Sequence, residues 1–238
     1  METHMLAGLV WVPASKTRRT QVALKSSITR VGLAGGVLIV FAFLLINTFS
    51  GAALGKEQLP QPDFKDFIDL VENDNGNMLS GVYIPNVLAL PIVQQPTEDA
   101  GYVSGRDDEA TQFELASQYG NVGLLAHNYL SGRFFEHLEV GEEVRLVYGD
   151  GKVEYFIITE VLRYQAFDPD SQWSSFRNLD NEDVLSAEQM FTRAYAGAWH
   201  VTFQTCIEAD GNSSWGRLFV IAVPKSLSFE HLIQQILQ

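Results

Sequence analysis

The most prominent feature in the pattern of apolar and polar residues is a stretch, 31–49, that is apolar apart from Asn47 and Thr48 near its end. No charged residue occurs from 31 to 55. At a helical rise of about 1.5 Å per residue the stretch spans roughly 30 Å, the thickness of a bilayer core. A globular helix of this length would show a polar stripe, which is missing here. The pattern predicts a transmembrane anchor at 31–54.

The charges on either side of this anchor predict its orientation. Five basic residues and one acidic residue precede it, which leaves 11 basic against 28 acidic residues behind it. By the positive-inside rule the leader, 1–30, is cytoplasmic, and the chain is a single-pass protein of the cell membrane. A proline-containing linker, 55–62, then leads to an extracellular domain, 63–238. A cleavable signal peptide is the rival interpretation, supported by small residues at 50–53.

Beyond the anchor the period of the apolar residues changes from helical to strand-like. Apolar residues at spacings of three and four predict a helix over 64–71, with Asp63 as its cap. Runs with a period of two then predict strands at 81–84, 87–93, 122–127, 143–148, 153–162, 198–206 and 217–223. The segment 167–196 is too long for a plain loop, and the composition from Ser186 onwards predicts a short helix. The fold class expected is mainly β, a closed barrel with short peripheral helices.

Composition and charge exclude several functions. The net charge of -13 argues against binding to a nucleic-acid backbone, which requires clustered basic residues. The single cysteine, Cys206, allows no intramolecular disulfide and no thiolate cluster for zinc. In an exported domain such a thiol is either an intermolecular link or a reactive group.

A reactive thiol needs a neighbouring imidazole, because an imidazolium favours the thiolate. His127 ends the apolar run 122–126 at the point where a strand meets a loop, a common location for functional side chains. A hydrogen-bonded structural histidine is as common in this position. His127 is therefore the best-placed base by position, with the structural role left open.

The other histidines are less well placed. His200 precedes Cys206 on the same predicted strand, and six extended residues at about 3.3 Å each separate the two by roughly 20 Å. His137 lies in an apolar helical turn, where a packing role is expected. His4 lies on the other side of the predicted anchor, and His231 lies in the C-terminal tail.

Arg217 opens an otherwise apolar run, 218–223, eleven residues after Cys206. That separation suits a hairpin, on which the guanidinium could donate to an oxyanion beside the thiol. A charge kept on an edge strand for solubility is an equally common reason for such an arginine. From the residues alone, a site formed by Cys206, His127 and Arg217 is therefore one hypothesis, and structural roles for these residues are its alternatives.

Three stretches together resemble the sortase family. They are VGLLAHN at 122–128, TFQTC at 202–206 and RLFV at 217–220, in the order in which sortases carry them. The family pattern at the nucleophile is Thr-Leu-x-Thr-Cys, from which this chain departs only at Phe203. Further similarity runs from YIP at 83–85 through PIV at 91–93 to Pro224.

This resemblance implies a sortase-type β-barrel and a cysteine transpeptidase that cleaves a Leu-Pro-x-Thr-Gly-like sorting signal through a thioester. It implies Cys206 as nucleophile, His127 as the acid that protonates the leaving amine, and Arg217 as the group that holds substrate or oxyanion. Thr205 would help to position the substrate. The partners implied are surface proteins with a sorting signal and an amine acceptor, such as a cell-wall precursor or a pilin lysine.

The sequence leaves alternatives open for the cofactor and for the function. No cofactor is required, although calcium binds near the corresponding acidic loop in some sortases, and the aspartates at 168 and 170 could equally form a solvated turn. Water could replace the amine acceptor. The alternative from another class is a non-catalytic, membrane-anchored β-barrel that binds a peptide or glycan.

Overall fold

The computed structural model describes residues 61–226, and the predicted leader (1–30) and anchor (31–54) lie outside them. Within the described part, no helix has the length and apolar character needed to cross a membrane. The predicted linker, 55–62, reaches the described part at its end. There the Gln61 side-chain amide donates to the backbone carbonyls of Ile84 (2.8 Å) and Leu88 (2.7 Å). Gln61 is therefore attached to the first hairpin of the domain that was expected to begin at residue 63.

The amphipathic helix predicted after Asp63 is present as α1 (Phe64–Val71). Its buried residues, Phe67 and Val71, pack against Tyr83. Asp63 occupies the N-cap position, but its side chain makes no capping hydrogen bond. Asp63 thus has the predicted position without a capping bond, and burial of the apolar face holds the helix in place.

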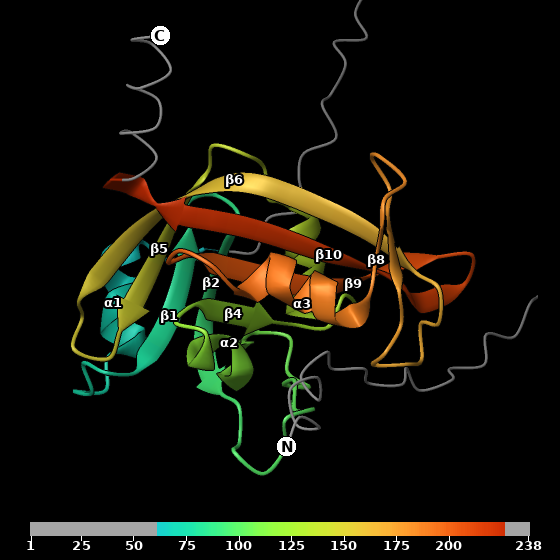
Figure 1. Cartoon of the computed structure of the whole chain (residues 1–238). Coiled ribbons are helices and arrows are strands. Elements are labelled where there is room, and N and C mark those ends of the chain that lie inside the picture. The colour runs from blue at the N-terminus through green and yellow to red at the C-terminus, as the bar shows by residue number, and fades with distance from the viewer. Residues whose placement is uncertain (1–60, 227–238) are drawn as a thin grey trace, which may run out of the picture. The chain divides into compact units, whose positions relative to one another are not determined.

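The strands form one sheet that closes on itself (Figure 1). They are β1 (Leu79–Ile84), β2 (Leu88–Gln94), β3 (Ala110–Phe113), β4 (Val122–Leu125), β5 (Glu143–Tyr148), β6 (Val153–Ala166), β7 (Phe176–Asn178), β8 (Val184–Leu185), β9 (Val201–Ala209) and β10 (Asn212–Pro224). The order is β10-β9-β4-β3-β2-β1-β5-β6, and pairing of β10 with β6 closes an eight-stranded barrel. Strands β7 and β8 extend the sheet beyond β6. The pairs β2–β3 and β4–β9 are parallel, and the other pairs are antiparallel.

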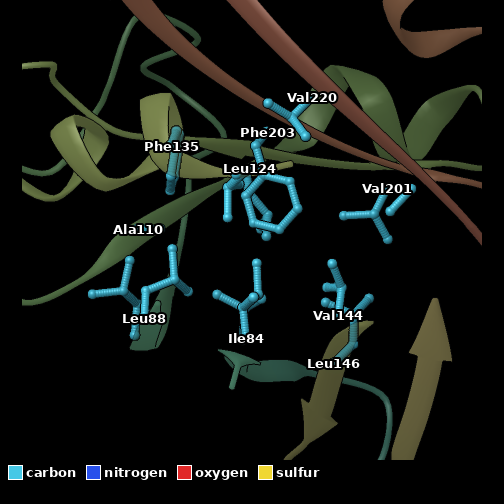
Figure 2. Packing of buried hydrophobic residues seen from close by; sticks show 14 of the residues in the cluster. Ile84, Leu88, Ala110, Leu124, Phe135, Val144, Leu146, Val201, Phe203 and Val220 are labelled. Atoms are coloured by element: carbon cyan, nitrogen blue, oxygen red, sulfur yellow. The ribbon is translucent and has the colours of Figure 1, made fainter. Parts of the chain in front are cut away.

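The interior of the barrel is filled by apolar side chains from strands all around it. Figure 2 shows Ile84, Leu124, Val144 and Phe203 converging from four different strands. Each strand sends alternate residues inward, so the period of two in the sequence corresponds to this interior. The predicted closed, mainly β barrel with short peripheral helices is confirmed for the described residues.

A second apolar cluster lies on the outer face of the barrel. Helix α3 (Ala187–Tyr195) packs there with the short helix α2 (Glu114–Gln118), through residues such as Phe191 and Tyr195 against Phe219. The helix predicted from Ser186 onwards is thus confirmed, and Ser186 forms a capping box with Gln189 at its start. A burial requirement on both sides explains why β10 is apolar without interruption from Leu218 to Val223.

The structure differs from the strand predictions in several places. Strand β4 ends at Leu125 and not at 127, β6 continues to Ala166, and β10 begins at Asn212. The segment 167–196 contains the hairpin β7–β8 besides α3, and β3 was missed because it has only four residues. The strand predicted over 198–206 begins at Val201. Residues 198 and 199 lie in a bend after α3, and the His200 ring nitrogens lie close to the carbonyl oxygens of Ala198 and Ala194.

Candidate active site

Cys206 and Arg217 are direct cross-strand partners in the hairpin formed by β9 and β10. Side chains directly opposite each other in an antiparallel pair project from the same face of the sheet, with Cβ atoms about 4.5–5.5 Å apart. The thiol is free and half-buried. The eleven-residue separation in the sequence therefore becomes direct adjacency in the barrel.

Alternation along the strands determines which face this pair occupies. Val201 and Phe203 on β9, and Leu218 and Val220 on β10, belong to the interior cluster. Side chains alternate between the two faces of a strand, and Cys206 lies an odd number of residues after Val201 and Phe203, which face inward. The Cys206 side chain therefore projects outward. The candidate nucleophile consequently lies on the outer face of the barrel, the face that α3 partly covers.

His127 follows strand β4, which runs parallel to β9. The register pairs Leu125 with Gln204, and the Ala126 N–H donates to the Gln204 carbonyl at 3.3 Å. His127 lies two residues beyond Leu125, as Cys206 lies two residues beyond Gln204. This parallel register places His127, just beyond the end of β4, beside the part of β9 that carries Cys206.

The environment of the His127 ring favours its neutral form. The ring of Tyr129 stacks on the imidazole, with centroids 5.1 Å apart and planes at 18°. Burial lowers the pKa of His127, and a hydrogen bond with the Val103 backbone opposes this shift. Since burial is the larger effect, the imidazole is predominantly neutral at pH 7.

Arg217 is held rigidly by backbone carbonyls. Its Nη1 donates to Ser214 (2.8 Å) and Gly216 (2.9 Å), and its Nη2 donates to Pro169 in the β6–β7 loop (3.3 Å). The residue is only 4% exposed. These bonds occupy three of the five guanidinium N–H groups, which leaves donors for an anion beside Cys206.

Thr205 projects to the opposite face from Cys206. Its hydroxyl donates to the Ala126 carbonyl at 2.8 Å, and the side chain is buried. The bond supports the end of β4 that leads to His127. A contact of Thr205 with substrate stays a prediction.

The turn after His127 is packed so closely that it requires glycine at position 132. This residue lies in the 3-10 helix η1 (Ser131–His137), and its N–H donates to the His127 carbonyl at 3.0 Å. A Cβ atom at Gly132 would lie 2.6 Å from the carbonyl oxygens of Ala126 and His127. Backbone atoms cannot move aside as the end of a side chain can, so the glycine keeps the His127 turn in its place.

The histidines judged less suitable are placed elsewhere. The ring nitrogens of His200 lie 2.7 and 2.9 Å from the carbonyl oxygens of Ala198 and Ala194, and the side chain is buried. His200 thus connects the end of α3 to the start of β9. His137 is the last residue of η1.

Several residues around His127 were missed by sequence reasoning. Tyr129 stacks on its ring, and the Asn128 amide donates to the Ser213 carbonyl at 2.9 Å, which links the His127 turn to the β9–β10 hairpin. The Val103 carbonyl is a backbone group, and no residue type marks it in the sequence. Tyr129 could have been suspected because it follows the candidate base by two residues.

The acidic residues of 167–196 do not gather into a metal site in the described structure. Across residues 61–226, no three His, Cys, Asp or Glu side chains lie close enough to hold a metal ion. Asp168 and Asp170 flank Pro169, whose carbonyl accepts from Arg217. The β6–β7 loop therefore contacts the candidate site through its backbone.

Among known proteins, those similar to this chain are found among solved structures. No protein-family model matches the chain, and no curated protein matches it. Sortase A of Listeria monocytogenes is 13% identical over 62% of this chain and 86% of its own, with a TM-score of 0.39. Sortase C-1 of Actinomyces oris is 14% identical over 70% and 84%, with a TM-score of 0.41. Sortase C1 of Streptococcus agalactiae, in a complex with MTSET, is 19% identical over 65% and 70%, with a TM-score of 0.38. All three are sortases.

Proposed function

We propose that this chain is a sortase-type cysteine transpeptidase. The observation that carries the proposal is the junction of three strands, where Arg217 lies directly opposite Cys206 and His127 follows the parallel strand on the other side. The sequence stretches that resemble sortases are the same ones that meet at this junction. A thiol, an imidazole and a fixed guanidinium on one face are the groups that acyl transfer through a thioester requires.

The first half of the reaction forms a thioester. The Cys206 sulfur attacks the carbonyl carbon of the Thr-Gly bond in a Leu-Pro-x-Thr-Gly-like signal, while its proton passes to His127. The remaining N–H groups of Arg217 stabilise the oxyanion that develops. The C–N bond then breaks, and His127 returns the proton to the leaving amine.

In the second half an amine acceptor, such as a cell-wall precursor or a pilin lysine, attacks the thioester. The Cys206 sulfur leaves and is protonated again, and a new amide bond forms, so peptide bonds are exchanged without net oxidation or reduction. The proposed setting is the outer face of the cell membrane, with the chain anchored through 31–54. Transfer to water would use the same residues and yield a free acid.

The test is to trap the acyl-enzyme. The full chain in detergent is mixed with a Leu-Pro-x-Thr-Gly peptide, and intact mass is measured before and after addition of an amine. A mass increase equal to the peptide up to its threonine is expected on the wild type and not on Cys206→Ala. Loss of this increase on addition of the amine, with a new amide product, indicates transpeptidation.

Two results of this experiment would contradict the proposal. If peptides bind without a covalent adduct while Cys206 reacts with a small alkylating reagent, the chain is a binding module. If the same adduct forms on Cys206→Ala, another residue is the nucleophile.

The neutral state of His127 leads to a prediction about pH. An imidazole whose pKa is lowered by burial supplies no positive charge to a thiolate at neutral pH, so only a minor fraction of the enzyme holds the thiolate–imidazolium pair. Turnover is expected to be slow, with a bell-shaped pH profile whose limbs belong to the pair. Alkylation of Cys206 by iodoacetamide should be slow at pH 5 and rise toward alkaline pH. A full thiolate rate already at pH 5 would show that this explanation is wrong.

A further inference from the structure

A β-bulge interrupts the pairing of β9 with β10 close to the candidate site. The register shifts between Asn212 and Gly216, so residues 213–215 of β10 lie opposite the single residue Glu208 of β9. The extra residues of a bulge leave the hydrogen-bond ladder, and their buried backbone groups need other partners. Side chains from neighbouring segments can therefore bind to β10 at this point.

Two consecutive carbonyls of the bulge bind side chains of the candidate site. The Asn128 amide donates to the Ser213 carbonyl at 2.9 Å, and the Arg217 Nη1 donates to the Ser214 carbonyl at 2.8 Å. Asn128 directly follows His127 in the chain. One short backbone segment thus connects the turn that carries the histidine with the guanidinium of the site.

Hydrogen bonds hold this backbone segment in shape. The Ser214 N–H belongs to the same planar peptide group as the Ser213 carbonyl, and it donates to the Asn212 side chain at 2.8 Å. Ser214 is buried, and the Arg217 guanidinium also binds the Gly216 carbonyl at 2.9 Å. The acceptor at the bulge is therefore held by bonds on both sides of it along β10.

The turn that carries His127 has a second attachment, to β9. The Thr205 hydroxyl donates to the Ala126 carbonyl at 2.8 Å, which holds the residue before the histidine. The Asn128 bond holds the residue after it to β10. His127 is half-buried between these two attachments. Loss of the Asn128 amide would remove the attachment to β10, so the imidazole would gain freedom to move relative to the thiol.

We propose that Asn128 is a positioning residue for His127. Its amide fixes the turn after β4 to the bulge of β10, and this keeps the imidazole beside the Cys206 thiol. Because the same bulge orients Arg217, one segment of β10 sets the positions of both groups that assist the thiol. The consequence for catalysis rests on the proposed function, whereas the effect of Asn128 on the pairing of imidazole and thiol does not.

The experiment compares the reactivity of Cys206 across pH in the full chain, kept in detergent. The second-order rate with iodoacetamide is measured by intact mass for the wild type, Asn128→Ala, His127→Ala and the double variant. A nearby imidazole raises the thiolate fraction below the ordinary thiol pKa of about 8.5, so His127→Ala should react more slowly at about pH 6–7. Asn128→Ala should lower the rate there by about two- to tenfold, the effect of one hydrogen bond. In the His127→Ala background the loss of Asn128 should change nothing further.

Gln94→Ala is the matched control. The Gln94 amide also donates to a backbone carbonyl at 2.9 Å, that of Leu79, and it lies on β2, which β3 and β4 separate from β9. This variant should keep the wild-type profile. The charged residues Arg217 and Glu208 on the two strands of the hairpin are present in every variant, so they cannot cause a difference between the profiles.

Peptide turnover gives a second readout, which depends on the proposed function. Asn128→Ala should lower kcat by about two- to tenfold with KM unchanged, because the amide binds the protein backbone and not the substrate. If Asn128→Ala does not fold, Asn128→Ser is judged by the same readouts, since its side chain is one atom shorter than that of asparagine and loses the bond to Ser213.

The outcomes separate this inference from the proposed function. A folded Asn128→Ala with the wild-type profile would overturn the role of Asn128 even in an active enzyme, and so would an equal loss of rate in the His127→Ala background. The expected profiles would support it even if no peptide formed an acyl-enzyme, a result that counts against the proposed function alone. Coinciding profiles of the wild type and His127→Ala would also overturn it, and trapping of the acyl-enzyme would then decide the proposed function separately.

Discussion

Replacement of His127 by alanine is expected to lower kcat/KM for a cognate sorting peptide by about 10²- to 10⁴-fold, the range for loss of a general acid-base group. His127 follows the strand parallel to that of Cys206, so it is the histidine that we expect to receive the thiol proton and return it to the leaving amine. Steady-state cleavage of the peptide measures the effect. Circular dichroism and the melting temperature show whether the variant is folded.

His200→Ala is the matched control, because His200 is a second histidine of the domain and lies near Cys206 in sequence. Its ring nitrogens lie within hydrogen-bond distance of two backbone carbonyls, so its loss should lower stability, by about 1–3 kcal/mol, and leave the turnover of folded protein largely intact. His137→Ala should also be active. An inactive but folded His200→Ala, together with an active His127→Ala, would show that the base is assigned to the wrong histidine.

Arg217→Ala is expected to lower kcat by about 10²- to 10³-fold, the usual effect of removing an oxyanion donor. The guanidinium lies opposite Cys206 and is oriented in advance by three carbonyls, so it needs no rearrangement when charge develops. Arg217→Lys should restore little activity, since an ammonium group cannot bind these carbonyls and an oxyanion in the same planar geometry. Single-turnover formation of the thioester is the measurement.

Two further measurements show whether the effect of Arg217→Ala on activity comes from catalysis, from lower stability or from the loss of a positive charge. Arg217→Ala leaves the buried carbonyls of Ser214 and Gly216 without their partner, so its melting temperature should also fall. Arg163→Ala removes a positive charge from an exposed position on the adjacent strand β6 and should keep activity within about twofold. If Arg217→Ala were folded and formed the thioester at the wild-type rate, the guanidinium would have no role in the reaction.

Local patterns in the sequence were sufficient for the elements that depend on neighbours in the chain. Helix α1 follows from apolar residues at helical spacing, and α3 begins at Ser186 with a capping box that uses residues three apart. The period of two predicted most barrel strands because alternate residues face one interior. The short strand β3 and the hairpin β7–β8 were not predicted, since runs of two to four residues contain too few alternations of apolar and polar residues.

For the candidate site, residue types and spacing identified Cys206, His127 and Arg217, but their proximity depends on strand pairing over long separations. The register of β4 on β9 joins residues almost 80 positions apart, and no local pattern encodes which strands pair in parallel. Hydrogen bonds from side chains to backbone carbonyls could not be predicted either, because no local pattern marks the carbonyl that accepts. Carbonyls at 169, 214 and 216 hold Arg217, although every residue type carries such a group. The sequence by itself thus determined which side chains can do the chemistry, and only the closure of the barrel decided which backbone groups orient them.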